Sequence, residues 1–230
     1  MNIAVILAGG KGLRLGNIIP KQMLMLGNKP LIAWSVDTFH KADIIDKIII
    51  VSEKNLIHEI QNLFPAAGYP KIISFIEGGE ERSDSSYNAL ISSEFSDDDI
   101  FLFHDAARPF VTEEIIIKII SNVKATGACG TYIQSTDTVA LLRDSIVESI
   151  PERKTVHYAQ TPQGFRYDLI KKAHEILKKN VEMAVTDDIS LVFNMGYTVS
   201  SIKGSLQNIK ITTELDFRFA EFLIVDGYKC

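Results

Sequence analysis

The chain has 230 residues, of which 46% are apolar and 23% are charged, and its formal net charge is −5 at pH 7. This length and composition predict a globular protein with one main domain over residues 1–230, and the acidic balance argues against a broad nucleic-acid-binding surface. Two distant cysteines, Cys129 and Cys230, suggest neither a zinc site nor a disulfide framework, so we expect a cytoplasmic protein. The apolar N-terminal run is too short for a signal peptide or a membrane span, so we expect neither export nor membrane insertion.

A glycine-rich loop follows the first predicted strand. An apolar run ends at Leu7, and the stretch 8–16 then contains four glycines. Backbone N–H groups exposed in such a loop bind anions, and Arg14 and Lys21 add two positive charges. The spacing matches neither the P-loop nor the dinucleotide-binding fingerprint. The pattern therefore predicts a phosphate-binding loop, with an ordinary strand-to-helix turn as the alternative.

Strands and helices alternate through the first half of the chain. Apolar runs predict strands at 47–52, 71–77, 100–103 and 127–133, and helices are predicted at 31–40, 53–64, 85–93 and from 112 onward. This alternation predicts an α/β fold with a Rossmann-like, doubly wound and mainly parallel sheet. In such sheets, ligands bind at the carboxyl ends of the strands.

Two more polar clusters follow predicted strands, so we expect them at the same edge of the sheet as the glycine loop. In the cluster at 104–109, Asp105 is an oxygen ligand suited to Mg²⁺ and Arg108 is a planar donor suited to phosphate. A structural pair between these two side chains is the alternative. In the cluster at 78–85, serine hydroxyls and a helix N-terminus would hold a base or ribose, or else Ser83 or Asp84 only caps the helix.

The pattern changes over residues 134–158, which read as two short strands around a turn at 144–145. We expect a β-hairpin arm that projects from the sheet. A two-stranded arm is marginally stable alone, so a second copy of the chain is the simplest partner, which predicts a homodimer. Thr138 and Arg153 lie on this arm and would bind an anion in a neighbouring site. Alternatively, Arg153 belongs to a solvated run of charges.

The last third of the chain is predicted to contain a helix at 166–179, a further helix that residues 186–188 cap and Gly196 terminates, strands at 198–203 and 208–213, and a C-terminal helix. Lys210 lies between two isoleucines in the last predicted strand. An ammonium group is costly to bury there unless it faces an anion. A lysine in water on an edge strand is the alternative.

Taken together, these motifs resemble those of cytidylyltransferases that activate sugar-alcohol phosphates, above all the 2-C-methyl-D-erythritol 4-phosphate cytidylyltransferase family of non-mevalonate isoprenoid biosynthesis. The resemblance covers nearly the whole chain. It rests on LAGGKGLRLG at 7–16, PKQ at 20–22, EGGEERSDS at 77–85, HDAARPF at 104–110, TDT at 136–138, AQTPQGF at 159–165, TDD at 186–188 and NIKITT at 208–213.

The resemblance implies a homodimeric, Mg²⁺-dependent enzyme that transfers CMP from CTP to a polyol phosphate and releases pyrophosphate. It implies that the nucleotide lies against Ala8, Gly9, Gly10, Gly12, Gly79, Glu80, Arg82, Ser85 and Ala106. It implies catalytic roles for Arg14, Lys21, Lys210 and Asp105, the last also as the Mg²⁺ ligand. The acceptor phosphate would be surrounded by Arg108, Thr161, Thr186 and Lys210, with Thr138 and Arg153 from the partner's arm.

The identity of the acceptor depends on details of these motifs. The form Ala-Gly-Gly at 8–10 is similar to relatives that use ribitol 5-phosphate, and Glu80 stands where aspartate is common. The clusters at 104–108 and 186–188 are more similar to the methylerythritol enzymes, whose acceptor we therefore predict. A ribitol-5-phosphate cytidylyltransferase that makes CDP-ribitol is the alternative. A non-catalytic nucleotide-binding regulator is a remote alternative, because it has no need for so much converging charge.

Overall fold

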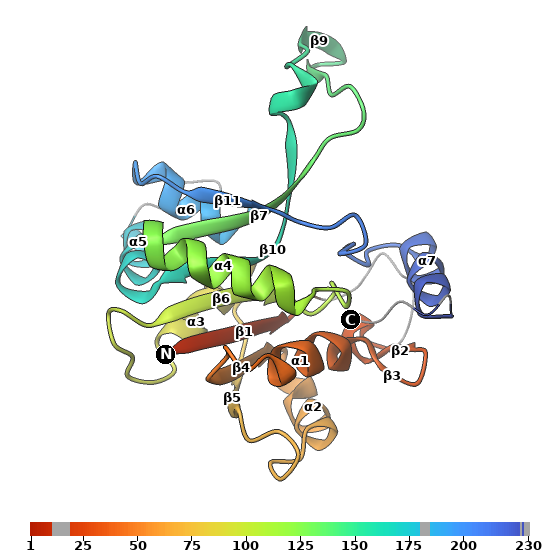
Figure 1. Cartoon of the computed structure of the whole chain (residues 1–230), viewed down its shortest axis with the longest axis vertical. Helices are drawn as coiled ribbons and strands as arrows, with labels where there is room; N and C mark the ends of the chain where they lie inside the picture. The colour runs from red at the N-terminus through yellow and green to blue at the C-terminus, as the bar shows by residue number, and fades with distance from the viewer. Residues whose placement is uncertain (11–18, 180–184, 226, 228–230) are drawn as a thin grey trace.

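The computed structural model describes residues 1–10, 19–179, 185–225 and 227 (Figure 1). Within these residues the main strands are β1 (Asn2–Ala8), β4 (Lys47–Ser52), β5 (Ile72–Glu77), β6 (Ile100–Asp105), β7 (Ala128–Gln134), β10 (His157–Arg166) and β11 (Ser200–Lys203). They form one seven-stranded sheet in the order β11-β7-β10-β6-β1-β4-β5. Only β10 runs antiparallel to its neighbours in this described sheet. The predicted Rossmann-like, mainly parallel α/β sheet is confirmed.

The antiparallel strand β10 is absent from the sequence-based prediction. Its sequence includes Pro162 and Gly164, residues that weaken a strand pattern. The register also shifts between Gln160 and Gly164, which breaks the regular alternation of side chains. A Cβ at position 164 would lie 2.5 Å from a methyl carbon of Ile119, so only glycine lets β10 approach the helix above it.

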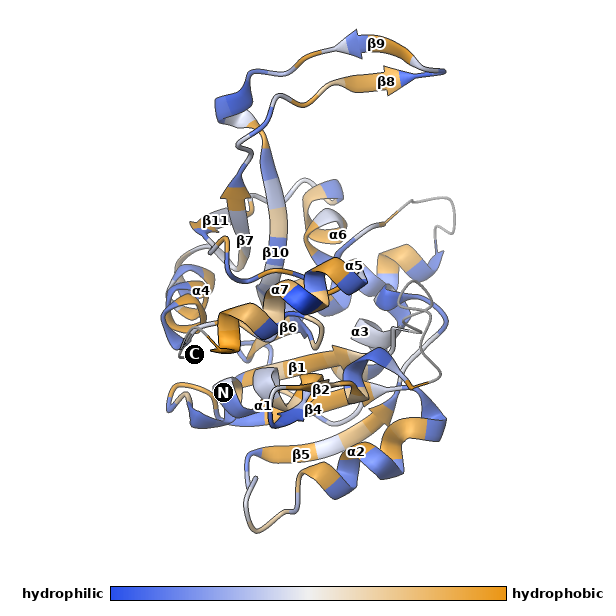
Figure 2. Ribbon diagram, turned by 90° about the vertical axis from the view of Figure 1, so that its right-hand side faces the viewer, coloured by the Kyte–Doolittle hydropathy of each residue, from blue (hydrophilic) through white to orange (hydrophobic). Residues whose placement is uncertain are grey.

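Helices cover both faces of the sheet (Figure 1). On one face lie α1 (Leu31–Lys41), α2 (Ile57–Leu63) and α4 (Glu113–Thr126), and on the other lie α3 (Arg82–Leu90), α5 (Tyr167–Lys179) and α6 (Asp188–Asn194). Side chains of β1 alternate between the two faces of the sheet. Ala4 and Ile6 pack in the apolar core on the face of α1, α2 and α4, while Ile3 and Val5 pack in the core on the face of α3, α5 and α6. Figure 2 shows these apolar strands lying between the helices.

The expected helix over 53–64 is present as a 3-10 turn, η3 (Lys54–Leu56), followed directly by α2. Two other local predictions are wrong. Helix α3 begins three residues earlier than expected, because Glu81 is the N-cap and forms a capping box with Asp84, which lies at the third helical position. The expected strand over 208–213 is an irregular segment. Its alternating isoleucines pack instead against the C-terminal helix α7 (Glu214–Val225).

The predicted arm is present as a hairpin that projects away from the sheet (Figures 1 and 2). Strands β8 (Leu141–Arg143) and β9 (Ile146–Ser149) pair antiparallel. Asp144 and Ser145 connect them with positive φ angles of 49° and 67°, as a tight two-residue hairpin turn requires. The short turn η4 (Arg153–Thr155) then leads back to β10.

Candidate active site

The carboxyl ends of β1, β5 and β6 border a cavity of about 850 Å³. Most residues that the sequence assigned to nucleotide binding or catalysis line this cavity, and they come from widely separated segments of the chain. They are Ala8, Gly9, Gly10, Lys21, Gly79, Glu80, Arg82, Ser85, Asp105, Ala106 and Lys210. Two other residues with predicted roles, Gly12 and Arg14, lie outside the described residues.

Glycines after β5 let this loop pack tightly on the start of α3. A Cβ at Gly79 would lie 2.1 Å from the Cβ of Asp84, and a Cβ at Gly78 would lie 2.9 Å from the Oγ of Ser85. The backbone N–H of Gly79 donates to the Ser85 hydroxyl at 3.1 Å. Ser85 therefore fixes the glycine loop at the cavity wall.

Asp105, at the end of β6, is a buried carboxylate among three cations. Its Oδ1 lies 3.3 Å from the Nε of Arg82, and its Oδ2 lies 2.7 Å from the Nζ of Lys210. The Nε of Arg108 lies 3.9 Å from the same Oδ2. Burial alone would raise the pKa of Asp105, but the charges of Arg82, Lys210 and Arg108 outweigh it and hold the pKa well below its usual range. The carboxyl group is therefore ionised at neutral pH.

Arg82 is shared between Asp105 and a second buried carboxylate, Asp188. Its Nη1 lies 2.5 Å from the Oδ2 of Asp188, which also accepts from the hydroxyl of Ser86 at 3.2 Å. The Nε2 of His174 lies 3.3 Å from the other oxygen of Asp188. Burial opposes both charges, but the ion pair dominates, so the pKa of Arg82 is raised and that of Asp188 is lowered. The Nη2 of Arg82 is buried and has no hydrogen-bond partner among the described residues.

The segment 208–213 carries Lys210 to the cavity and accepts a hydrogen bond from Lys21. Its main chain is fixed by a hydrogen bond from the N–H of Ile211 to the carbonyl of Ala107, at 2.9 Å. The Nζ of Lys21 donates to the carbonyl of Ile211 at 2.9 Å, while Lys210 contacts the carboxylate at the end of β6. The anion that a lysine between two isoleucines was expected to face is therefore Asp105.

Thr161 and Arg108 lie beside this carboxylate and are engaged with the protein itself. The backbone N–H of Asp105 donates to the Thr161 hydroxyl at 3.1 Å. The guanidinium of Arg108 donates to the carbonyls of Asn208 at 2.8 Å and Ala159 at 3.3 Å, and its burial lowers its pKa. Arg108 therefore connects β10 to the segment that carries Lys210.

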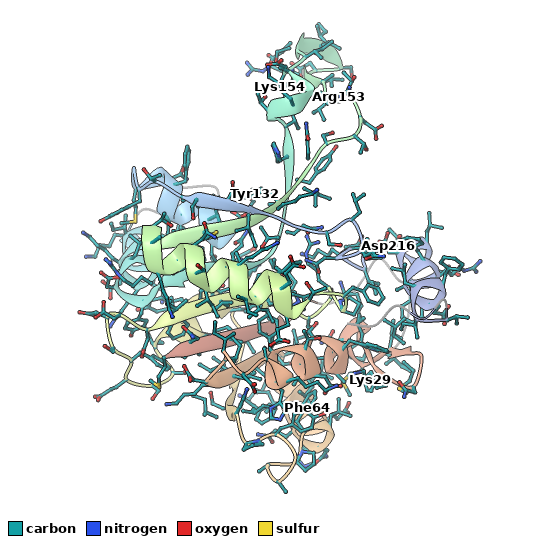
Figure 3. The ribbon with its side chains drawn as sticks, viewed as in Figure 1. Lys29, Phe64, Tyr132, Arg153, Lys154 and Asp216 are labelled. Carbon is teal, nitrogen blue, oxygen red and sulfur yellow. The ribbon has the colours of Figure 1, made fainter. Side chains whose placement is uncertain are left out.

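Of the residues predicted to bind the acceptor, Lys210 lines the main cavity, whereas Arg108, Thr161, Thr186, Thr138 and Arg153 do not. Thr186 lines a neighbouring cavity of about 450 Å³, which shares Arg82 with the first. Thr138 and Arg153 are exposed on the arm. Figure 3 shows Arg153 well above the sheet. The described chain brings its own nucleotide-side residues together but not these arm residues.

Comparisons with known proteins bear on this arrangement. The profile of the 2-C-methyl-D-erythritol 4-phosphate cytidylyltransferase family matches residues 2–226. The chain belongs to this family. It is therefore a nucleotidyltransferase. It is 39% identical over 223 residues to the Clostridium perfringens (strain SM101 / Type A) 2-C-methyl-D-erythritol 4-phosphate cytidylyltransferase, covering 96% of this chain and 98% of the relative.

Other members of the family agree in sequence and in structure. The Thermosipho africanus 2-C-methyl-D-erythritol 4-phosphate cytidylyltransferase is 38% identical and covers 94% of this chain and 95% of its own length. The crystal structure of 4-diphosphocytidyl-2C-methyl-D-erythritol synthase from Anaerococcus prevotii superposes with a TM-score of 0.86 at 30% identity, over 97% of this chain and 98% of that one. The Francisella tularensis 2-C-methyl-D-erythritol 4-phosphate cytidylyltransferase gives 0.81 at 31% identity, over 96% and 98%.

Several residues of the site were not found from the sequence. Asp188 was assigned only to a helix start and to the TDD motif, since its contacts with Arg82 and Ser86 reach about a hundred positions back in the chain. His174 was assigned only to the helix over 166–179, and it contacts Asp188. Gln22 is buried in the cavity wall, and its Nε2 has no partner among the described residues. Its position directly after Lys21, in a motif already recognised, was the available signal.

Among the described residues, no cluster of three or more His, Cys, Asp or Glu side chains is placed to hold a metal ion. None of the helices in this part of the chain is long and apolar enough to cross a membrane.

Proposed function

We propose that this family member transfers CMP from CTP to 2-C-methyl-D-erythritol 4-phosphate and releases pyrophosphate. One observation carries the assignment: the ionised Asp105 lies with Arg82 and Lys210 on a single cavity bordered by glycine-rich main chain. Converging charge of this kind suits a polyphosphate and the reaction at its phosphorus atoms. The family to which the chain belongs supports both the nucleotide and the acceptor.

In the proposed reaction, a phosphate oxygen of the acceptor attacks the α-phosphorus of CTP. A new P–O bond forms while the P–O bond to the β-phosphate breaks, and pyrophosphate leaves with its electron pair. The attacking oxygen is already anionic, so no general base is needed. Lys21 and Lys210, joined by Arg14 as the sequence predicts, would stabilise the charge that develops around the phosphorus.

The donor set at the cavity fits Mg²⁺. This ion is commonly held by one or two protein carboxylates together with phosphate oxygens and water. Asp105 offers one ionised carboxylate at the cavity wall, and the triphosphate of CTP would supply further oxygens. We therefore propose Asp105 as the protein ligand of Mg²⁺, which when bound would neutralise negative charge on the phosphates.

A second copy of the chain would complete the acceptor side. Five large apolar side chains on the arm are between 52% and 70% exposed, and they are Leu141, Leu142, Ile146, Val147 and Ile150. Such a concentration on an unsupported hairpin favours burial against another subunit. We propose that residues 134–158 act as a dimerisation subdomain of the single domain at 1–230. Thr138 and Arg153 of one subunit would then join Arg108, Thr161 and Thr186 of the other.

The compartment that we propose is the cytoplasm. Cys129 is buried and unpaired, and burial raises the pKa of its thiol, which keeps the group protonated. A free thiol without a disulfide partner in the described chain is typical of a reducing environment.

Pyrophosphate release with purified enzyme, CTP and Mg²⁺ tests the function, with 2-C-methyl-D-erythritol 4-phosphate and ribitol 5-phosphate compared as acceptors. We expect kcat/KM to be at least about a hundredfold higher for the methylerythritol substrate, a difference of about 2.7 kcal/mol in transition-state stabilisation. A preference for ribitol 5-phosphate would overturn the acceptor assignment. CTP binding without turnover of either acceptor would favour the regulatory alternative.

A chelator arm of the same experiment tests the metal. EDTA is expected to abolish pyrophosphate release, and added Mg²⁺ is expected to restore it. Full activity in excess EDTA would contradict the role of Asp105 as a metal ligand.

A further inference from the structure

His104 precedes Asp105 on β6 and is completely buried. Its ring packs against Phe39, with centroids 5.1 Å apart. Both ring nitrogens have polar neighbours: Nδ1 lies 3.1 Å from the Thr161 hydroxyl oxygen, and Nε2 lies 3.0 Å from the carbonyl oxygen of Arg108. A buried imidazole with two such contacts connects two parts of the site.

These contacts determine which nitrogen of His104 carries the proton. The Arg108 carbonyl only accepts hydrogen bonds, so Nε2 must be the donor. In a neutral ring Nδ1 is then an acceptor, and the Thr161 hydroxyl must donate to it. A neutral ring satisfies both contacts, because the Thr161 hydroxyl already accepts from the backbone N–H of Asp105 and its own proton needs an acceptor.

The Thr161 hydroxyl therefore makes two hydrogen bonds, one as acceptor and one as donor. It accepts from the backbone N–H of Asp105 and donates to Nδ1 of His104. The Thr161 carbonyl in turn accepts from the side-chain amide of Asn208 at 2.9 Å. The proposed metal ligand, the proposed acceptor-binding threonine and the lysine-bearing segment thus share one hydrogen-bonded chain.

We propose that His104 is a positioning residue for cytidylyl transfer: its Nε2-protonated ring orients the Thr161 hydroxyl and the Asp105–Arg108 turn, which carries Asp105 at the cavity wall. This inference rests on the proposed function and assigns His104 no contact with substrate. It acts through Thr161 and Arg108, which flank the carboxylate.

The two hydrogen-bond partners of the His104 ring differ in whether another group can replace His104. The Arg108 carbonyl also accepts from the Ser35 hydroxyl at 3.3 Å, so it keeps a donor if His104 is lost. The proton of the Thr161 hydroxyl has no second acceptor within hydrogen-bond distance in the described part of the chain. Loss of the Nδ1 acceptor is therefore expected to matter more than loss of the Nε2 donor.

Two substitutions of His104 by amide side chains each keep one of its two hydrogen bonds and remove the other. His104→Asn places a side-chain oxygen near the position of Nδ1 and keeps an acceptor for Thr161. His104→Gln places its amide near Nε2 and keeps a donor for Arg108 but removes that acceptor. Packing alone predicts the opposite order of damage, because asparagine is smaller and leaves the larger void.

Steady-state kinetics with CTP and 2-C-methyl-D-erythritol 4-phosphate provide the readout. We expect His104→Asn to retain kcat/KM for the acceptor within about fivefold of the wild type, and His104→Gln to lose about 20-fold or more, consistent with a polar group left unpaired. KM for CTP is expected to stay within about twofold in both, because the altered contacts lie on the acceptor side. Equal losses, or a larger loss in His104→Asn, would overturn the proposal.

The tautomer gives a second test that is independent of turnover. In nitrogen-15 NMR of histidine-labelled protein without substrate, the histidine signals lost in His104→Gln are expected to be those of a neutral ring with its proton on Nε2. A proton on Nδ1, or a charged ring at neutral pH, would overturn the proposal. If the wild-type enzyme failed to release pyrophosphate, the proposed function would fall, whereas the tautomer would still decide the placement of His104.

Discussion

The cavity wall and the arm are built on opposite physical principles. At the cavity, charged side chains are buried and paired within one chain, as in the sharing of Arg82 between Asp105 and Asp188. On the arm, apolar side chains are exposed, and the guanidinium of Arg153 donates to the carbonyl of Thr136 at 3.5 Å. A single chain therefore positions its proposed nucleotide site alone, whereas the arm has the composition of a surface that needs a partner. Substitutions at the two places are expected to fail in different ways.

Lys21→Ala is expected to produce the largest effect, at the cavity. Removing one preorganised positive charge from the transition state costs about 3–4 kcal/mol, so kcat should fall by roughly two to three orders of magnitude. Thermal unfolding should change little. The measurement is kcat at saturating CTP and acceptor, with Lys118→Ala, an exposed lysine on α4, as the control. Turnover within a few-fold of the wild type would show that Lys21 does not act in catalysis.

Asp188→Asn is expected to destabilise the protein as well as the site. The substitution removes one of the two carboxylates that pair with buried Arg82, which is expected to cost about 3 kcal/mol of unfolding free energy at pH 7. The folded-state pKa of Asp188 lies below that of an unfolded aspartate, so its contribution is complete above about pH 5 and is lost as the pH falls through the folded value.

Urea unfolding at pH 7 and pH 3 measures this difference. The gap between wild type and Asp188→Asn should narrow at the lower pH. A gap that stays constant would mean that the ionised Asp188 is not the source of the stability.

Arg153→Ala is expected to change substrate binding without changing the fold. If Arg153 reaches the acceptor of a second subunit, KM for the acceptor should rise about 10- to 30-fold, as for a lost charged hydrogen bond, while KM for CTP stays within about twofold. Lys154→Ala, the exposed neighbour in η4, is the matched control and should leave both KM values unchanged. Equal changes in the two KM values for Arg153→Ala would argue against a role in acceptor binding.

Ile146→Asp on the arm is expected to have the smallest effect on unfolding. This side chain is 70% exposed in the single chain, so the free energy of unfolding of the monomer should change by less than about 0.5 kcal/mol. Sedimentation equilibrium should nevertheless show a weaker dimer, because a charge would enter the proposed interface. An unchanged dimer would place the interface elsewhere.

The sequence predicted those features whose residues lie close together along the chain. Asp105 and Lys210 were found because each lies in a local motif, and the hairpin was found because its turn and alternating strands are neighbours in sequence. The irregular course of 208–213 was missed, since alternating isoleucines that pack on α7 look like a strand. Strand β10 was missed because proline, glycine and a register shift hide its pattern.

The buried partners of the site were missed for a different reason. The hydrogen bonds of Asp188 to Arg82 and Ser86 span more than a hundred positions, and no local spacing reveals them. His104 was noted only as part of the cluster at 104–109 and of the HDAARPF motif, because its role depends on which atoms the fold places around its ring. Site residues that lie together in one segment can be predicted from the sequence, whereas contacts between distant segments require the structure.

Subunit complementation tests most directly the claim that each site joins one chain's cavity to another chain's arm. Lys21→Ala and Arg153→Ala proteins would be unfolded together, refolded together and assayed at acceptor concentrations below KM. In the mixed dimer, one site combines an unaltered cavity with an unaltered arm. Random pairing should therefore restore about a quarter of the wild-type rate, because about half of the dimers are mixed and half of their sites are complete. A mixture no more active than the average of its two parents would contradict the account.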